Sequence, residues 1–226
     1  MTMLAKMRLL QIGSQAIPIG GYSHSHGLEA AIESGLVRDE PTVQQWITDM
    51  LSFSIGSYEV ACLEKMSEAW IVQDFDALRG LNDEFLATRE SAELRSATVQ
   101  MGFSMRALLA VLPNLPHTLI SALQTMHEPS LPCVWSGAAN AWAIAPCDSM
   151  AAYLWSWAEN QVLVAMKSVP IGQSSGQRVL LNMGSQIAQL MERRQSRDDR
   201  KHSNFVPGLA ILSSQHETQY SRLFRS

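Results

Sequence analysis

The sequence predicts an all-α protein, a single-domain bundle of about eight to ten helices. Apolar residues recur at intervals of three and four along most of the chain, which is the spacing of one face of a helix. Alternating VxVxV-type segments are absent, and glycine and proline lack the short regular spacing of a β-sandwich or barrel. Hydrophobic residues make up 46% of the 226 residues and charged residues only 17%, which provides ample material for a core.

Two helices are predicted in the first half of the chain from their apolar pattern. Residues 42–53 have apolar side chains at helical spacing, with Asp39 as the expected N-cap and Pro41 in the first turn. Residues 89–112 form one long apolar stripe that ends at Pro113.

The second half of the chain predicts two further long helices. Residues 148–168 are apolar almost all round, which predicts the central helix of the bundle, and Asp148 is its expected N-cap. Residues 173–194 form the next helix, after a break at Pro170 and Gly172. Shorter helices are expected at 25–35, 58–72, 74–87, 116–127 and 132–145.

The chain divides into an N-terminal segment (1–22), a helical bundle (23–194), a flexible linker (195–204) and a C-terminal tail (205–226). The linker, QSRDDRKHSN, is charged and has no apolar residues for a core. The tail regains apolar residues, which must either pack back on the bundle or dock on a partner. We expect both the N-terminal loop and the tail to order on partner binding. These residues are Leu209, Ile211, Leu212, Tyr220, Leu223 and Phe224.

Charge, cysteine content and hydropathy argue against several classes of protein. The net charge of −4 does not indicate the basic face of a nucleic-acid binder. The three cysteines, Cys62, Cys133 and Cys147, form no CxxC pair and indicate buried thiols in a reducing compartment. No apolar run approaches the roughly 20 residues that span a bilayer, and polar residues interrupt the apolar stretch near the N-terminus. We therefore expect a cytoplasmic protein with no membrane partner.

Two motifs could bind a small ligand, but both have simpler interpretations. The segment GQSSGQR (172–178) lacks the GK[ST] ending of a P-loop, so turns joining helices are favoured over a nucleotide site. His24 and His26, helped by Glu29, could chelate a metal ion such as nickel only in an extended turn. We favour loop or interface histidines and leave a nickel carrier as an alternative.

A second alternative is a helical enzyme, because the segment NDEFLATRESAELR (82–95) is dense in charge. Glu90, Glu93 and Arg95, with Lys167 from a later helix, could provide acid and base groups. The simpler interpretation is a salt-bridge network on a helix surface or a polar interface, in which Arg89 and Glu93 pair at i, i+4.

Four segments in order resemble the UreF family of urease accessory proteins. They are LLQIGSQAIPIGGYSHSHGLEAAIESG, NDEFLATRESAELR followed by Met101-Gly102, VPIGQSSGQR and HETQYSRLFRS. The resemblance implies an all-α protein without enzymatic activity or cofactor, usually dimeric, that joins UreD (UreH in some organisms) and the GTPase UreG. The resemblance further implies that the assembly acts on urease apoprotein to install nickel and that this chain regulates GTP hydrolysis by UreG.

The resemblance also implies which residues contact partners, and neither a catalytic residue nor a metal ligand is among them. The tail supplies most of these residues, and aromatic and arginine side chains are the usual hot spots of interfaces. The expected residues are Pro18, Gly20, Gly21, Tyr22, Ser23, Lys167, Gln173, His216, Glu217, Tyr220, Arg222, Leu223 and Phe224.

Overall fold

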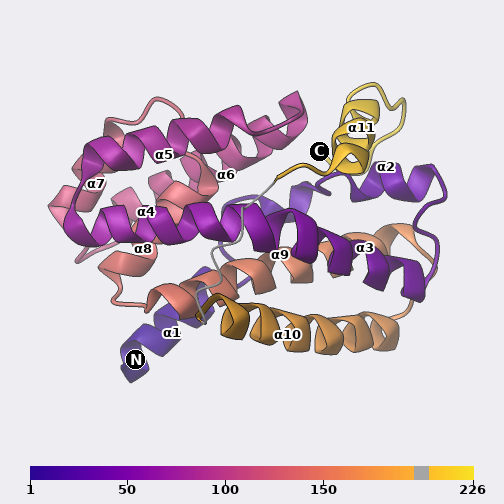
Figure 1. The fold of residues 1–226 in the computed structure, drawn as a ribbon, viewed down its shortest axis with the longest axis horizontal. Coiled ribbons are helices and arrows are strands. Elements are labelled where there is room, and N and C mark those ends of the chain that lie inside the picture. Colours follow the sequence, from indigo (N-terminus) through magenta and orange to yellow (C-terminus); the bar gives the residue numbers. More distant parts are fainter. Residues whose placement is uncertain (196–203) are drawn as a thin grey trace.

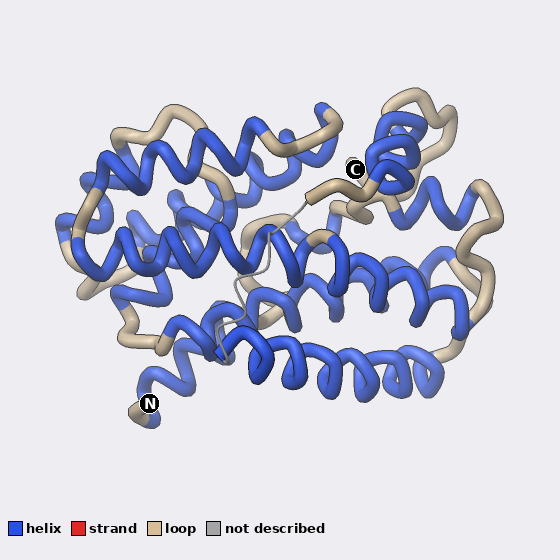
Figure 2. The backbone as a smooth tube through the Cα atoms, in the orientation of Figure 1, coloured by secondary structure: helices blue, strands red, loops and turns tan. Residues whose placement is uncertain are grey.

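One long helix, Pro146–Ser168 (α9), lies at the centre of the fold. The computed structural model describes residues 1–195 and 204–226, and within these ranges it contains helices and turns but no strand (Figure 2), so the all-α prediction is confirmed. The other α-helices are α1 (Met3–Ile12), α2 (Leu28–Glu33), α3 (Glu40–Phe53), α4 (Val60–Val72), α5 (Phe75–Ala87), α6 (Ala92–Val111), α7 (His117–Gln124), α8 (Leu131–Ala141), α10 (Gln173–Gln195) and α11 (Pro207–His216).

Helix α9 contacts helices from every part of the chain. It packs against α1, α2, α3, α4, α8 and α10, which confirms the central position expected from its apolar surface. Helices α4 to α8 form one side of the molecule, and α2, α3, α10 and α11 lie on the other (Figure 1). Burial of Leu154, Ala158, Val162 and Ala165 fixes α9 in this position.

The helix starts follow local capping chemistry. The predicted cap of α3 is confirmed, since the Asp39 side chain accepts from Thr42 N–H and Pro41 lies in the first turn. The prediction that Asp148 is the N-cap of α9 is wrong. The helix begins two residues earlier at Pro146, whose fixed φ and missing N–H suit the first helical position, and Asp148 lies in the first turn.

The long helix predicted at residues 89–112 begins later than the apolar pattern indicated. Ser91 is the N-cap of α6, and its side chain accepts from Leu94 N–H. Arg89 therefore lies before the helix and pairs with Glu59, so the predicted i, i+4 pair of Arg89 with Glu93 is wrong.

Two helices were not predicted from the sequence. Helix α1 lies within the N-terminal segment and is capped by Thr2, whose side chain accepts from Ala5 N–H. Helix α11 forms the first half of the tail and packs against α2 and α6. Of the predicted flexible linker, 196–203 lie outside the described residues, while Asn204 donates to the Thr88 carbonyl oxygen.

The sequence predicts no segment that is long and apolar enough to span a bilayer. Within the two described ranges, no helix is both long enough and apolar enough to cross a bilayer.

Glycine at position 102 permits a close approach between α6 and the segment before α8. A Cβ atom at Gly102 would lie 2.0 Å from the Pro129 carbonyl oxygen, whereas a Cβ atom at Gly80, inside α5, would meet nothing within 4 Å. An alanine side chain at position 80 would therefore be accommodated in α5, whereas one at position 102 would force α6 away from the segment before α8.

We predict opposite effects on stability for the same substitution at these two sites. Gly102→Ala should lower the free energy of unfolding by about 1–3 kcal/mol, because the new methyl group overpacks a backbone contact. Gly80→Ala should raise it by up to about 1 kcal/mol through helix propensity. Urea unfolding followed by circular dichroism measures both, and equal signs would contradict the assigned packing of α6.

Candidate functional site: the docked C-terminal tail

A glycine-containing loop prepares the surface on which the tail lies. Gly27 has a φ of +83° and directly precedes α2. A Cβ atom there would lie 2.8 Å from Leu209 Cδ1 of α11. Glycine at this position therefore satisfies two requirements, the left-handed backbone and the close approach of the tail helix.

A group of four polar side chains, which we name the Glu29 cluster, joins the tail to the bundle. It consists of Glu29 on α2, Glu93 on α6, and His216 and Arg222 in the tail. His216 is fully buried, with its Nε2 atom 2.9 Å from Glu29 Oε2 and its Nδ1 atom 2.7 Å from Glu93 Oε2. Arg222 Nη1 donates to Glu93 Oε1 at 2.9 Å. The cluster thus brings together residues that are far apart in the sequence.

The carboxylate of Glu29 also binds the backbone of the tail. Leu223 N–H donates to Glu29 Oε1 at 2.7 Å, and Phe224 N–H donates to Glu29 Oε2 at 3.0 Å. These charge-assisted bonds compensate for the burial of Glu29, whose side chain is 8% exposed. Glu29 therefore fixes both the tail helix, through His216, and the segment that follows it.

The last residues of the tail lie against the histidine loop. Ser226 O accepts from the N–H groups of Ser25 and His26, and Arg225 N–H donates to the Ser23 carbonyl oxygen at 2.8 Å. On the other side of the loop, Asn160 of α9 donates to the His24 carbonyl oxygen at 2.8 Å. The loop is thus packed between the tail and the central helix.

His24 and His26 have structural partners. His24 Nδ1 lies 2.8 Å from Ser226 Oγ, and Trp157 Nε1 donates to His26 Nδ1 at 2.9 Å. Burial lowers the pKa of His24 to about 3, with the nearby His26 and Arg225 adding to the shift. Burial and the charge of Arg89 lower the pKa of His26 to about 4. Both rings are neutral near pH 7, and these contacts favour the loop interpretation over a nickel chelate.

The expected partner residues separate into buried and exposed groups. His216 and Phe224 are buried against the rest of this chain, so their side chains hold the tail in place and do not form an outer surface. Gly20, Gly21 and Ser23 are half-buried. The exposed residues are Pro18, Tyr22, Lys167, Gln173, Glu217, Tyr220, Arg222 and Leu223.

Lys167 connects the end of α9 with the tail. Its Nζ atom lies 5.7 Å from the centre of the Phe224 ring, a cation–π contact. Its side chain is exposed in the last turn of α9, where positive charge also favours the helix dipole. The two exposed sites implied by the resemblance, the tail and Lys167, are therefore adjacent through Phe224.

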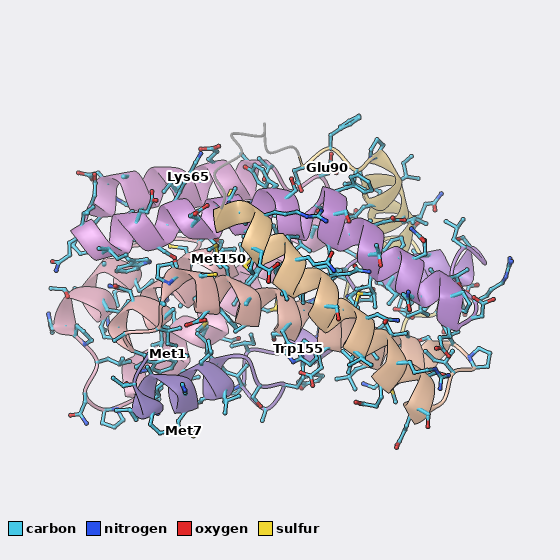
Figure 3. All side chains as sticks on the ribbon, turned by 60° about the horizontal axis from the view of Figure 1, so that its bottom comes forward. Met1, Met7, Lys65, Glu90, Met150 and Trp155 are labelled. Carbon is cyan, nitrogen blue, oxygen red and sulfur yellow. The ribbon has the colours of Figure 1, made fainter. Side chains whose placement is uncertain are left out.

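The residues of the enzyme alternative do not form one site. Glu90 is exposed at the edge of the molecule (Figure 3), Arg95 pairs with Glu128, and Glu93 belongs to the Glu29 cluster. These separate pairings agree with the simpler interpretation of a polar network and interface.

A cavity of about 100 Å³, which was not predicted, is lined by other residues than those of the enzyme alternative. It is lined by Arg89, Glu59 and Tyr153 among others, and Tyr153 OH donates to Glu59 Oε2 at 2.8 Å. Ligand pockets usually measure roughly 300–1,000 Å³, so this cavity is small for a substrate. No local pattern in the sequence indicates this cavity, because the residues that line it come from segments far apart in the chain.

Comparison with known proteins identifies the family. The family model described as UreF matches residues 37–184. "Urease accessory protein UreF" of Dechloromonas aromatica (strain RCB) is 50% identical over 226 residues, covering 100% of this chain and 99% of that protein. The protein of the same name from Azoarcus sp. (strain BH72) is 46% identical over 227 residues, covering 99% and 97%. Because the family model matches more than half of the chain and these relatives match nearly all of it, this chain belongs to the UreF family.

Proposed function

We propose that this chain is an accessory protein of urease maturation that has no enzymatic activity of its own. It acts within a chaperone complex on urease apoprotein while the nickel centre is incorporated. The observation that carries the proposal is the similarity over the whole chain to proteins named urease accessory protein UreF. Of the side chains considered for catalysis, Arg95 and Glu93 are engaged in separate ion pairs, which supports a binding role.

In this proposal the tail presents the surface that binds UreD or UreH. Docking on the bundle leaves several large apolar side chains of the tail in solvent, and Leu223 is 73% exposed although its neighbour Phe224 is buried. Exposed apolar residues rimmed by charge are typical of protein-binding sites. The exposed residues are Phe205, Ile211, Tyr220 and Leu223.

The N-terminal end provides a second exposed apolar surface. Helix α1 lies at the edge of the molecule (Figure 3), and its inner face is buried through Ala5 and Ile12. Its outer side chains remain in solvent, which supports binding through both ends of the chain. They are Met3, Leu4, Met7 and Leu10.

The same proposal assigns contact with the GTPase UreG, and control of its GTP hydrolysis, to the region of Lys167 and Gln173. Both side chains are exposed, and they flank the turn between α9 and α10. We further propose that the chain forms a homodimer in the complex and acts in the cytoplasm, where its three cysteine thiols would remain reduced.

Replacing the exposed tail residues tests the proposed UreD surface. Tyr220→Ala with Leu223→Ala should weaken UreD binding at least about thirtyfold, because aromatic and apolar hot spots contribute about 2 kcal/mol or more. Co-purification and titration calorimetry measure the loss. The matched control is Ile71→Ala with Val72→Ala, which removes two exposed apolar side chains of α4. Unchanged UreD binding by the tail variant would refute the assignment.

Lys167→Ala tests the proposed contact with UreG. We expect the rate of GTP hydrolysis in the assembled complex to change while assembly is preserved, because the substitution removes an exposed charge and, apart from the cation–π contact with Phe224, leaves the buried side chains in place. Lys65→Ala, at an exposed position of α4 (Figure 3), is the control and should leave the rate unaltered. Loss of assembly with Lys167→Ala would assign the residue a structural role at the tail instead.

A further inference from the structure

A groove of about 620 Å³ lies between α4 and α5, on the side of the molecule away from α11 (Figure 1). The two helices form a hairpin whose turn contains Gln73, in the left-handed region, and Asp74, the N-cap of α5. The hairpin is anchored in the core by Trp70, which is buried and whose ring centre lies 5.8 Å from that of Phe75. The groove therefore lies on a firmly packed pair of helices.

One face of each helix lines the groove. The lining residues follow the spacing i, i+3, i+4 and i+7 along each helix, which is the spacing of a single face. They are Lys65, Glu68, Ala69 and Val72 of α4, Ala77, Gly80, Leu81 and Glu84 of α5, and Asp74 of the turn. Since a helix rises about 1.5 Å per residue, the lined stretch is about 10 Å long, or two turns.

The groove offers apolar contact to another molecule. Val72 is 72% exposed, and its neighbour Ile71 is 56% exposed. Leu81 is half-buried, and a Cβ atom at Gly80 would meet nothing within 4 Å, so the groove is open above α5. A helix that binds in a groove uses apolar anchors at the same i, i+3, i+4 and i+7 spacing. The groove therefore has the length and the apolar surface for about two turns of such a helix.

The charge of the groove determines which kind of helix it complements. Its lining contains three carboxylates against one ammonium, a net charge of −2. Among the residues that the structure describes, no basic side chain forms an ion pair with Glu68 or Glu84, whereas Asp76 is paired with Arg79. Unpaired carboxylates beside an apolar groove attract lysine or arginine and repel nucleic acid and anionic lipid.

We propose that the groove between α4 and α5 binds an amphipathic helix of a partner protein that carries lysine or arginine beside its apolar face. The apolar side chains of that helix lie against Val72 and Leu81, and its cations lie beside Glu68 and Glu84. Because α11 lies on the other side of the molecule (Figure 1), this partner can bind while the tail surface is occupied. The inference depends on neither of the surfaces assigned in the proposed function.

Binding of two synthetic helical peptides to the full chain, measured by fluorescence anisotropy, tests the proposal. Both peptides carry leucine at i, i+3, i+4 and i+7, and the remaining positions are lysine in one and glutamate in the other. The lysine peptide should bind at least about tenfold more tightly, because only its charge complements the groove. Equal affinity of the two peptides, or no binding of the lysine peptide, would overturn the proposal.

Charge reversal locates the bound peptide. Glu68→Lys with Glu84→Lys should lower the affinity for the lysine peptide at least about tenfold, because attraction becomes repulsion on both helices. The matched control is Glu33→Lys with Glu192→Lys, which changes the net charge equally at exposed positions of α2 and α10 and should leave the affinity nearly unchanged. An equal loss in the two variants would show nonspecific attraction and overturn the proposal.

Val72→Ala tests the apolar part of the groove without disturbing the core, because this side chain is mostly exposed. The affinity for the lysine peptide should fall about threefold or more, since a buried CH₂ group contributes about 0.8 kcal/mol. An unchanged affinity would contradict a helix seated in the groove.

A second copy of this chain is the alternative occupant, because α1 has exposed apolar side chains together with Lys6 and Arg8. Sedimentation equilibrium of the chain distinguishes the two. We expect Glu68→Lys with Glu84→Lys to have the same association state as the unaltered chain. Weaker self-association of this variant would assign the groove to a second copy and overturn the proposal.

Discussion

The arrangement of the tail depends on one buried carboxylate, that of Glu29. A buried charge is tolerated only where hydrogen bonds and opposite charge replace its hydration. Glu29 accepts hydrogen bonds from the N–H groups of Leu223 and Phe224 and contacts the ring of His216, all of which belong to the tail. Without the tail, α2 would present an unpaired carboxylate, and without Glu29 the imidazole and two backbone donors would lose their acceptor. The tail and the bundle therefore complete one another.

This docking gives the tail two distinct sides. The inner side, with His216 and Phe224, stabilises the fold, and the outer side, with Tyr220 and Leu223, faces solvent. Phe224 also contacts Lys167 at the end of the central helix. In the function proposed above, the contact places the UreD surface and the UreG surface on a common structural element. A partner that moves the tail would thereby alter the surroundings of Lys167, which is a direct physical route for coupling.

Local patterns in the sequence predicted most of the helices and the central position of α9, because periodicity reports which face of a helix is buried. They did not predict α1, whose apolar residues lie on all sides, or the start of α6, where the cap Ser91 overrides a longer apolar stripe. The resemblance indicated the tail, but the Glu29 cluster has no local signal. Glu29 and His216 are 187 positions apart, and their pairing exists only in the folded chain.

The most direct test of the role of Glu29 is the protection of the Leu223 and Phe224 amides in Glu29→Gln. A hydrogen bond to an ionised acceptor contributes about 1.5–3 kcal/mol and one to a neutral acceptor about 0.5–1.5 kcal/mol. Because two amide bonds are weakened, protection at neutral pH should fall roughly ten- to a hundredfold while the bundle core remains protected. Glu33→Gln, at an exposed position of the same helix, should match the unaltered chain. Equal protection in Glu29→Gln and Glu33→Gln would contradict the role assigned to the buried carboxylate.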